Sequence, residues 1–229
     1  DVYTFKFSYT NDKEATVSFA HTFSNDRVTA KINLYKVDKE TGKAVPQGDA
    51  TLKGAVYGLY AREDIVHPGG GTGTIYKAGE QVATLTTDDK GQSSVNGLYL
   101  GKYYVKEITP PTGYLADTEE HDLVCSYEGD MTVEVKRECT SSEQVIKQPF
   151  QIIKAANNGK TDADLLSRAG FTVYLKSSLT KKADGSYDFD SAKPVVSGEN
   201  GTTEIFTDEK GYACSIPLPF GSYIVRETT

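Results

Sequence analysis

The chain has 229 residues, a formal net charge of −7 and 38% apolar residues. That length is enough for about two domains of ordinary size. The acidic balance argues against a nucleic-acid partner and suits an extended, soluble surface. No apolar run is long enough to span a membrane, and no signal peptide is recognisable at the N-terminus. The chain opens on Asp1-Val2-Tyr3, so we expect it to be part of a longer polypeptide.

The composition favours strands and turns over helices, because the chain has 15 tyrosines, 21 glycines and no tryptophan. Short alternating runs predict strands, in chain order, at residues 3–9, 15–23, 31–38, 55–61, 80–86, 102–108, 122–127, 131–139, 150–154, 171–176, 201–206 and 221–226. Turn signals such as Asp89-Lys90-Gly91 stand between them. Many short strands separated by turns indicate an all-β chain built of β-sandwiches.

One sequence pattern occurs twice in the chain. Residues 87–91 recur as residues 207–211, and residues 101–107 recur as residues 221–227, at a constant offset of 120 (207 − 87 and 227 − 107). A repeat of this length corresponds to a whole domain. The repeat therefore divides the chain into tandem domains.

The repeat sets three segments. We expect residues 1–27 to be the terminal strands of a preceding, or swapped, β-sandwich domain. Residues 28–147 form one complete domain, and residues 148–229 form a domain that lacks its last strands. A sandwich without its last strands has an open edge, and the N-terminal strands have no sandwich, so the two defects are complementary.

Each copy carries an acid on the apolar face of a late strand and a lysine on the apolar face of its first strand. Strand alternation places Glu107 and Glu227 inward, and it places Lys36 and Lys154 inward as well. A buried charge is costly unless it has a partner. One reading is a partly buried salt bridge at the rim of each sandwich, and the other is a reactive pair.

Four segments carry a resemblance to a known family, namely residues 34–42, 52–60, 87–91 and, most specifically, 101–114, which run Gly-Lys-Tyr-Tyr-Val-Lys-Glu-Ile-Thr-Pro-Pro-Thr-Gly-Tyr. Together they resemble the Cna B-type, or SpaA-like, repeat domain of Gram-positive surface adhesins and pilins. The resemblance implies tandem Ig-like, prealbumin-like β-sandwich domains strung as beads in a stalk. It also implies an extracellular location, anchored to the cell wall of a Gram-positive bacterium.

The resemblance further implies a self-made isopeptide bond from a first-strand lysine to a last-strand asparagine, promoted by an acid. Carried over to this sequence, the isopeptide amines are Lys36 and Lys154, the proton-shuttle acids are Glu107 and Glu227, and the acceptor is Asn25. Burial raises the pKa of a glutamate, so the acid can protonate the asparagine carbonyl and then the leaving nitrogen. Such a bond forms once, so we expect protein maturation rather than an enzyme, with no cofactor.

The complete domain departs from this pattern because no asparagine occupies the acceptor position. Counting back eleven residues from Lys36 gives Asn25, but counting back eleven from Lys154 gives Glu143, and counting from the strand start gives Ser141. A carboxylate would have to lose water, which is unfavourable without activation. We therefore expect no isopeptide bond in residues 28–147, and a salt bridge from Lys36 to Glu107, with Glu143 as a further partner.

Two assemblies are compatible with the orphan strands. In one, the Asn25 strand enters the Lys154/Glu227 domain of another copy, head to tail, and propagates a fibre. In the other, the chain is a fragment whose missing strands are simply absent or disordered. The partners would be other copies or neighbouring domains of the same surface protein.

Other signals are weak. We expect Cys125, Cys139 and Cys214 to be free thiols, and the scattered histidines indicate no metal site. The glycine run at residues 68–74 predicts a hairpin insertion rather than a phosphate loop. Two function classes remain: a structural stalk or pilus segment, and an adhesin module that binds a host protein or glycan. The near-identical repeats favour the stalk.

Overall fold

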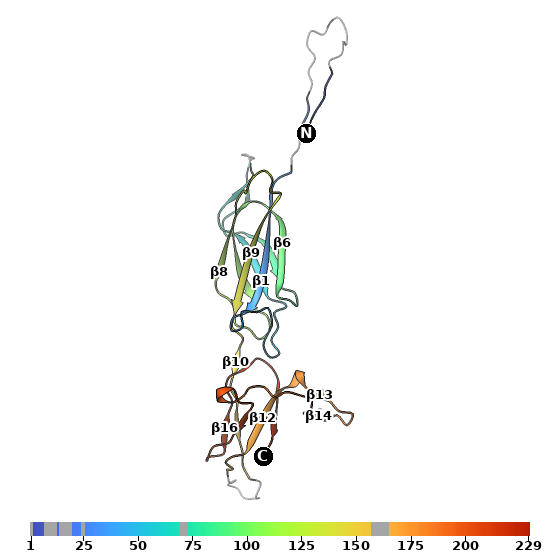
Figure 1. Ribbon diagram of the computed structural model, residues 1–229. Coiled ribbons are helices and arrows are strands. Elements are labelled where there is room, and N and C mark those ends of the chain that lie inside the picture. Colours follow the sequence, from blue (N-terminus) through green and yellow to red (C-terminus); the bar gives the residue numbers. More distant parts are fainter. Residues whose placement is uncertain (1, 7–12, 14–19, 24–25, 69–72, 157–164) are drawn as a thin grey trace.

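The computed structural model describes residues 2–6, 13, 20–23, 26–68, 73–156 and 165–229. Within these residues the chain consists of strands, turns and two short 3₁₀ helices, so the prediction of an all-β fold is confirmed. The strands form two groups, β1–β9 and β10–β18, which follow each other along the chain (Figure 1). No helix in the described part of the chain has the length and apolarity needed to cross a membrane.

The first unit is a two-sheet sandwich with a small side hairpin. One sheet has the order β6-β1-β9 and the other has the order β5-β2-β7-β8. The strands are β1 (Thr29–Asp38), β2 (Val56–Ala61), β5 (Gln81–Thr86), β6 (Gln92–Leu98), β7 (Gly101–Thr109), β8 (Glu120–Cys125) and β9 (Glu134–Glu143). The hairpin of β3 (Ile65–Val66) and β4 (Thr74–Tyr76) occupies the glycine-rich insertion, whose residues 69–72 lie outside the described part.

Strand alternation builds the core of the first unit. In β1 every second residue is buried, from Ala30 through Ile32 and Leu34, and in β7 Tyr103 and Val105 are fully buried. The two inner faces meet in one cluster of apolar side chains. The same alternation carries charged residues inward at the end of each strand, which is where the candidate site lies.

The first and last strands of the first unit, β1 and β9, are parallel neighbours. They pair without a register shift from Thr29 opposite Glu134 to Asp38 opposite Glu143. The remaining sheet contacts are antiparallel. Because the first and last strands run in the same direction, the chain passes from one end of the sandwich to the other (Figure 1).

The second unit repeats this arrangement, but its described residues include no counterpart of β8 or β9. Its strands are β10 (Lys147–Gln148), β11 (Gln151–Ile153), β12 (Gly170–Leu175), β13 (Thr180–Lys181), β14 (Tyr187–Asp188), β15 (Glu204–Phe206), β16 (Tyr212–Cys214), β17 (Leu218–Pro219) and β18 (Tyr223–Glu227). The order β15-β12-β18 matches β5-β2-β7, and the β10–β17 and β11–β16 pairs match β1–β6. The strand register is also the same in both units. Phe171 of β12 pairs with Glu227 of β18, just as Tyr57 of β2 pairs with Glu107 of β7.

The Thr-Asp-x-Lys-Gly pattern has the same structural role in both units. Thr87 Oγ1 donates to Leu52 O at 2.6 Å, and the Asp88 carboxylate accepts from the backbone N–H groups of Lys90 and Gln92. Gly91 has a φ of +71°, and a Cβ added there would lie 2.8 Å from Lys36 O. Thr207, Asp208 and Gly211 repeat these features. The repeated pattern thus anchors a turn against the first strand.

Several predicted strand limits differ from the structure. Strand β6 was not predicted, because its polar sequence Gln-Ser-Ser-Val-Asn-Gly-Leu lacks the usual residues of a strand. Strand β9 begins at Glu134 and continues through Glu143, beyond the predicted limit of Cys139. The described residues 2–6 and 20–23 form no strand, and the rest of the two predicted N-terminal strands lies outside the described part.

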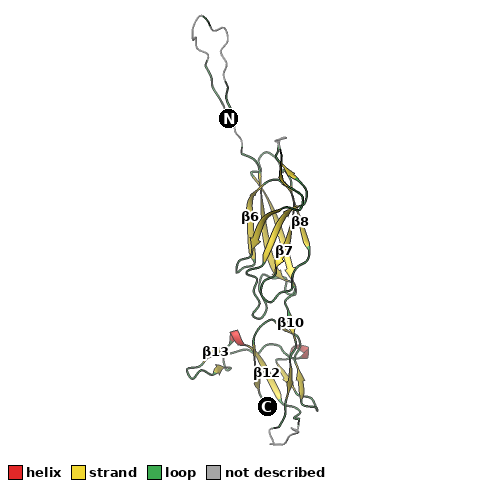
Figure 2. Cartoon of the chain, turned by 180° about the vertical axis from the view of Figure 1, so that it is seen from behind, coloured by secondary structure: helices red, strands yellow, loops and turns green. Residues whose placement is uncertain are grey.

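The two units contact each other through a defined junction (Figure 2). Asp49 of the first unit donates its N–H to Phe220 O at 2.8 Å, and its carboxylate accepts from Ser222 N at 2.9 Å. The ring of Phe220 lies against Gly113, where an added Cβ would come within 2.8 Å of the ring. Gly113 also binds the connecting segment, because its carbonyl accepts from Ile146 N at 2.8 Å.

Candidate functional site

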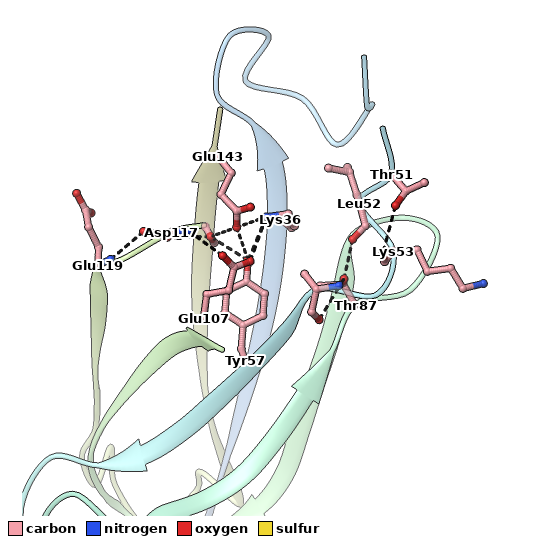
Figure 3. Close-up of polar contacts among 12 residues, drawn as sticks. Lys36, Thr51, Leu52, Lys53, Tyr57, Thr87, Glu107, Asp117, Glu119 and Glu143 are labelled. Atoms are coloured by element: carbon pink, nitrogen blue, oxygen red, sulfur yellow. Dashed lines mark hydrogen bonds and ion pairs between the residues drawn. The ribbon is translucent and has the colours of Figure 1, made fainter. Parts of the chain in front are cut away.

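The candidate site is a group of charged side chains buried between β1, β7 and β9. Lys36, on β1, has a side chain with no exposed surface, and Glu107 on β7 and Glu143 on β9 are each about 1% exposed. Figure 3 shows the three side chains pointing toward one another from their separate strands. The pattern of alternation that places Leu34 and Val105 in the core therefore also buries this lysine and these acids.

The lysine is in contact with both acids. Lys36 Nζ forms an ion pair with Glu143 Oε1 and lies 3.5 Å from Glu107 Oε1. It also lies 3.4 Å from the hydroxyl of Tyr57. The predicted pair of Lys36 with Glu107, with Glu143 as a further partner, thus describes three side chains that the fold brings together.

Hydroxyl groups complete the site. The Tyr57 hydroxyl donates to Glu143 Oε1 at 2.8 Å and lies 3.0 Å from Ser141 Oγ, while Ser141 Oγ lies 2.9 Å from Asp117 Oδ2. The backbone N–H of Asp117 donates to Glu107 Oε2 at 2.7 Å, and Asp117 Oδ2 contacts His121 Nε2 at 2.8 Å. The network therefore leads from the buried ion pair to the surface at His121.

The charges do not balance if every acid is ionised, since Glu107 and Glu143 share a single lysine. Burial, together with the hydrogen bond and negative charge of Glu143, raises the pKa of Glu107 to about 7. The Asp117 N–H and the charge of Lys36 act in the opposite direction without cancelling that rise. Below neutral pH, Glu107 is therefore protonated and the three groups are neutral overall.

Two buried carboxyl oxygens, Glu107 Oε1 and Glu143 Oε2, have no hydrogen-bond donor among the described groups. A proton on Glu107 allows its carboxyl group to hydrogen-bond to Glu143, in agreement with the raised pKa of Glu107. Burial also raises the pKa of Tyr57, which keeps its hydroxyl as a donor to Glu143. The site consequently carries one ammonium, one carboxylate and one neutral carboxyl group.

A second buried acid, Asp38, lies two residues beyond Lys36 on the same face of β1. It accepts hydrogen bonds from the Tyr114 hydroxyl at 2.9 Å, from Gln47 Nε2 at 3.1 Å and from the N–H of Thr41 at 2.9 Å. Although burial opposes ionisation, these donors hold the pKa of Asp38 below its usual value. Asp38 therefore stays ionised without a lysine partner.

The second unit presents the equivalent pair in an open setting. Lys154 Nζ lies 2.7 Å from Glu227 Oε1, but the two side chains are 29% and 44% exposed. Their burial is incomplete because no strand among the described residues covers them from the positions that β8 and β9 occupy in the first unit. The predicted acceptor Asn25 lies outside the described residues.

The sequence did not single out Tyr57, Asp117 or Asp38 as parts of a site. Tyr57 had a usable signal, because it shares a face with Leu59 in an alternating strand, and a buried tyrosine hydroxyl needs a partner. Asp117 lies in the loop between β7 and β8, where no periodicity predicts its direction. Its role arises only from tertiary structure.

No group of three or more His, Cys, Asp or Glu side chains is arranged to hold a metal ion in the part of the chain that the structure describes. Cys125, Cys139 and Cys214 are free thiols. Burial raises the pKa of Cys139 to about 11, which makes it a poor nucleophile at neutral pH.

Comparison with known families finds a match to most of the first unit. Residues 30–138 match the model of the SpaA prealbumin-like fold domain. These limits cover the sandwich from β1 to the middle of β9 and include Lys36 and Glu107. No curated protein sequence matches the chain significantly.

Three solved structures illustrate what the chain is similar to. The Bacillus anthracis TIE protein is 23% identical with a TM-score of 0.55, and the match covers 88% of this chain and 29% of that one. A streptococcal ancillary pilin is 22% identical with a TM-score of 0.37, covering 90% and 55%, respectively. The shaft pilin SpaA of Lactobacillus rhamnosus GG is 17% identical with a TM-score of 0.35, covering 88% and 87%. The chain thus spans less than two thirds of the first two proteins.

Removing the buried lysine should destabilise the first unit strongly. Lys36→Met leaves the Glu143 carboxylate buried without its cation, and we expect a loss of about 3–5 kcal/mol in the free energy of unfolding. Urea denaturation followed by tyrosine fluorescence measures this loss. Lys31→Met on the outer face of the same strand is the matched control, with an expected change of about 0.5 kcal/mol or less. Equal losses for the two variants would contradict the role given to the ion pair.

The stability of the first unit should also depend on the protonation of Glu107. Because its folded pKa is raised from 4.5 to about 7, this group contributes stability that is complete below pH 4.5 and is lost as the pH rises through 7. Relative to Glu107→Gln, the wild-type chain should therefore lose about 2–3 kcal/mol between pH 4.5 and pH 8. Paired urea titrations at the two pH values measure the difference. Parallel pH profiles for the two chains would show that Glu107 has an ordinary pKa.

Proposed function

Because residues 30–138 belong to the SpaA family of prealbumin-like domains, we propose that this chain is a structural stalk segment of a pilus-type surface protein. Its location is the exterior of a Gram-positive cell, in a protein anchored to the wall. Its partners are neighbouring domains or other copies of the same protein. The observation that carries this proposal is the parallel pairing of β1 with β9 and the buried ion pair that joins them.

The geometry of these two strands suits a chain that is pulled from its ends. Force enters the first unit at Thr29, the start of β1, and leaves at Glu143, the end of β9. Because the strands are parallel and fully paired, that force shears all of their hydrogen bonds together instead of opening them one at a time. Each bond is weak alone, so loading many at once raises the resistance of the fold.

The charged site reinforces the same connection. Glu143 is the last residue of β9, and its carboxylate holds Lys36 of β1 and the hydroxyl of Tyr57 on β2. Glu107 adds β7 to the group, so the site links both sheets of the sandwich where the chain leaves it. The first unit is stiffened by this ion pair, without a covalent bond, because a glutamate stands where the family carries an asparagine.

The second unit is completed by further strands, and it then closes covalently. Its β11 and β18 have free edges where β9 and β8 would pair, and Ile153 and Val225 are 59% and 42% exposed. A strand pair with the sequence of residues 2–25 places Asn25 at the position that Glu143 holds in the first unit. Supplied by another copy, this pair joins subunits head to tail.

The covalent step in the completed unit joins Lys154 to Asn25. The neutral Nζ attacks the Asn25 side-chain carbonyl carbon, a carbon–nitrogen amide bond forms, and the original amide nitrogen leaves as ammonia. Glu227, which already contacts Lys154, carries the proton from the amine to the leaving nitrogen. Added strands exclude water from Lys154 and Glu227. Burial of this kind raises the pKa of a carboxyl group, which lets it hold the proton that it transfers.

Intact mass spectrometry tests the absence of a covalent bond in the first unit. We expect the monomeric chain to have the mass of its sequence, and a peptide map should recover the Lys36 and Glu143 peptides separately. A loss of one water with a linked Lys36–Glu143 peptide would overturn the non-covalent reading while leaving the stalk role in place. The Lys36→Arg variant serves as the reference that has no reactive amine.

Mixing residues 28–229 with a peptide of residues 2–27 tests strand complementation. We expect a product that survives a denaturing gel and has the summed mass minus one ammonia. Lys154→Arg and Glu227→Gln should each abolish it, whereas Lys181→Arg, on the exposed strand β13, should not. If the peptide neither binds nor reacts, the head-to-tail assembly is wrong, and the missing strands come from elsewhere in the polypeptide.

A further inference from the structure

The junction between the two units shows which surfaces of this fold stack end to end. The lower surface, on the first unit, consists of the Asp49 turn and the Gly113 loop. The upper surface, on the second unit, is the turn from β17 to β18 with Phe220 at its centre, together with Ile146 of the connecting segment. Phe220 N donates to Ile146 O at 2.8 Å, so the turn and the connection form one surface.

The first unit has the same upper surface at its opposite end. The offset of 120 residues places Tyr99 and Leu100 where the second unit has Pro219 and Phe220. Sheet register confirms the match, because Ala30 pairs with Leu98 as Gln148 pairs with Leu218. The two units also share a hydrogen bond here. The Tyr103 hydroxyl donates to Tyr99 O, and the Tyr223 hydroxyl donates to Pro219 O, each at 2.6 Å.

In the first unit nothing in the described chain covers this surface. It forms an open cavity of about 580 Å³, lined among others by Arg27, Val28, His67, Tyr99, Leu100 and Tyr127. The lining is mainly apolar and aromatic, unlike the polar surface expected for a free end of a domain. An apolar end surface of this kind indicates a partner.

The surface is also preformed. Arg27 donates to the carbonyls of Gly97 at 2.7 Å and Leu98 at 3.1 Å, and its guanidinium lies 3.8 Å from the centre of the Tyr99 ring. His67 meets the other side of the site with its ring 5.8 Å from that of Tyr99. Because these contacts fix the segment that leads into β1, the end surface keeps its shape without an occupant.

We propose that this cavity is a socket for the lower end of another unit of the same fold, stacked ahead of Arg27. The occupant presents a turn like that of Asp49 and a loop like that of Gly113, and Leu100 takes the place of Phe220 against them. The inference rests on the proposed stalk function, and it adds that the stalk continues as a stiff rod on this side through the same kind of joint.

The rims of the two joints differ in charge. At the existing junction, the Asp49 carboxylate of the first unit accepts hydrogen bonds from two groups of the second unit, the Ser222 N–H and the Ser177 hydroxyl. The corresponding positions of the first unit are Lys102 and Glu63, whose side chains pair at 3.0 Å. The Ser177 hydroxyl is thus replaced by the Glu63 carboxylate, whose charge is paired with Lys102, so the rim of the socket offers no net positive charge to an acidic turn.

A chain with one added unit tests the socket. Residues 28–144 are joined directly to residues 27–229, so that Arg27 and Val28 take the places of Val145 and Ile146 in a new joint. Small-angle X-ray scattering then measures whether the longer chain is one rod. We expect the wild-type tandem chain to fit a single extended shape, and Leu100→Asp or Tyr99→Ser at the new joint to require a range of bent shapes.

Two controls separate the possible outcomes. Val124→Asp, at an exposed position of β8 in the same unit, should leave the rod unchanged, and Phe220→Asp should loosen only the existing junction. If the wild-type tandem chain bends at the new joint as freely as its Leu100→Asp variant, the socket proposal is overturned. If the original 229-residue chain itself bends freely, the stalk proposal fails instead.

Discussion

The structure depends on a lysine that the fold buries completely. Lys36 stands on the apolar face of β1, and a buried ammonium is tolerated only with a close counter-charge. That requirement brings Glu143 from β9 and Glu107 from β7 to the same place, and it thereby fixes how three strands and both sheets meet. Burial, together with the hydrogen bond and negative charge of Glu143, then raises the pKa of Glu107 to about 7, so the local charge and the local geometry are set together.

The comparison of the two units shows how far this constraint depends on enclosure. Lys154 and Glu227 have the same strand positions and a similar separation, yet both remain partly exposed. Water screens such a pair, so it contributes little to stability. In the part of the chain that the structure describes, the architectural difference that bears on this pair is the presence of β8 and β9 in the first unit. Those strands convert a surface ion pair into a buried one.

Strand alternation and the internal repeat were sufficient to predict the all-β fold and the inward direction of Lys36 and Glu107. They failed where local sequence does not carry the information. Strand β6 is polar because one face of its sheet is open to solvent, and it forms through pairing with β1 rather than through its own propensity. Asp117 reaches the site from a loop, and Asp38 is satisfied by donors from Gln47 and Tyr114. Tertiary contacts alone could reveal these roles.

The parallel pairing of β1 with β9 connects the chemistry of the site to the way the units stack. Parallel terminal strands place the two chain ends of a unit at opposite poles, so the next unit must continue along the same axis. The Asp49 turn and the Gly113 loop then meet the Phe220 turn directly where Glu143 leaves the buried site. A pull on the chain is consequently carried from the junction into the Lys36–Glu143 pair and through the paired strands to the opposite pole. Stiffness within a unit and alignment between units follow from one choice of strand direction.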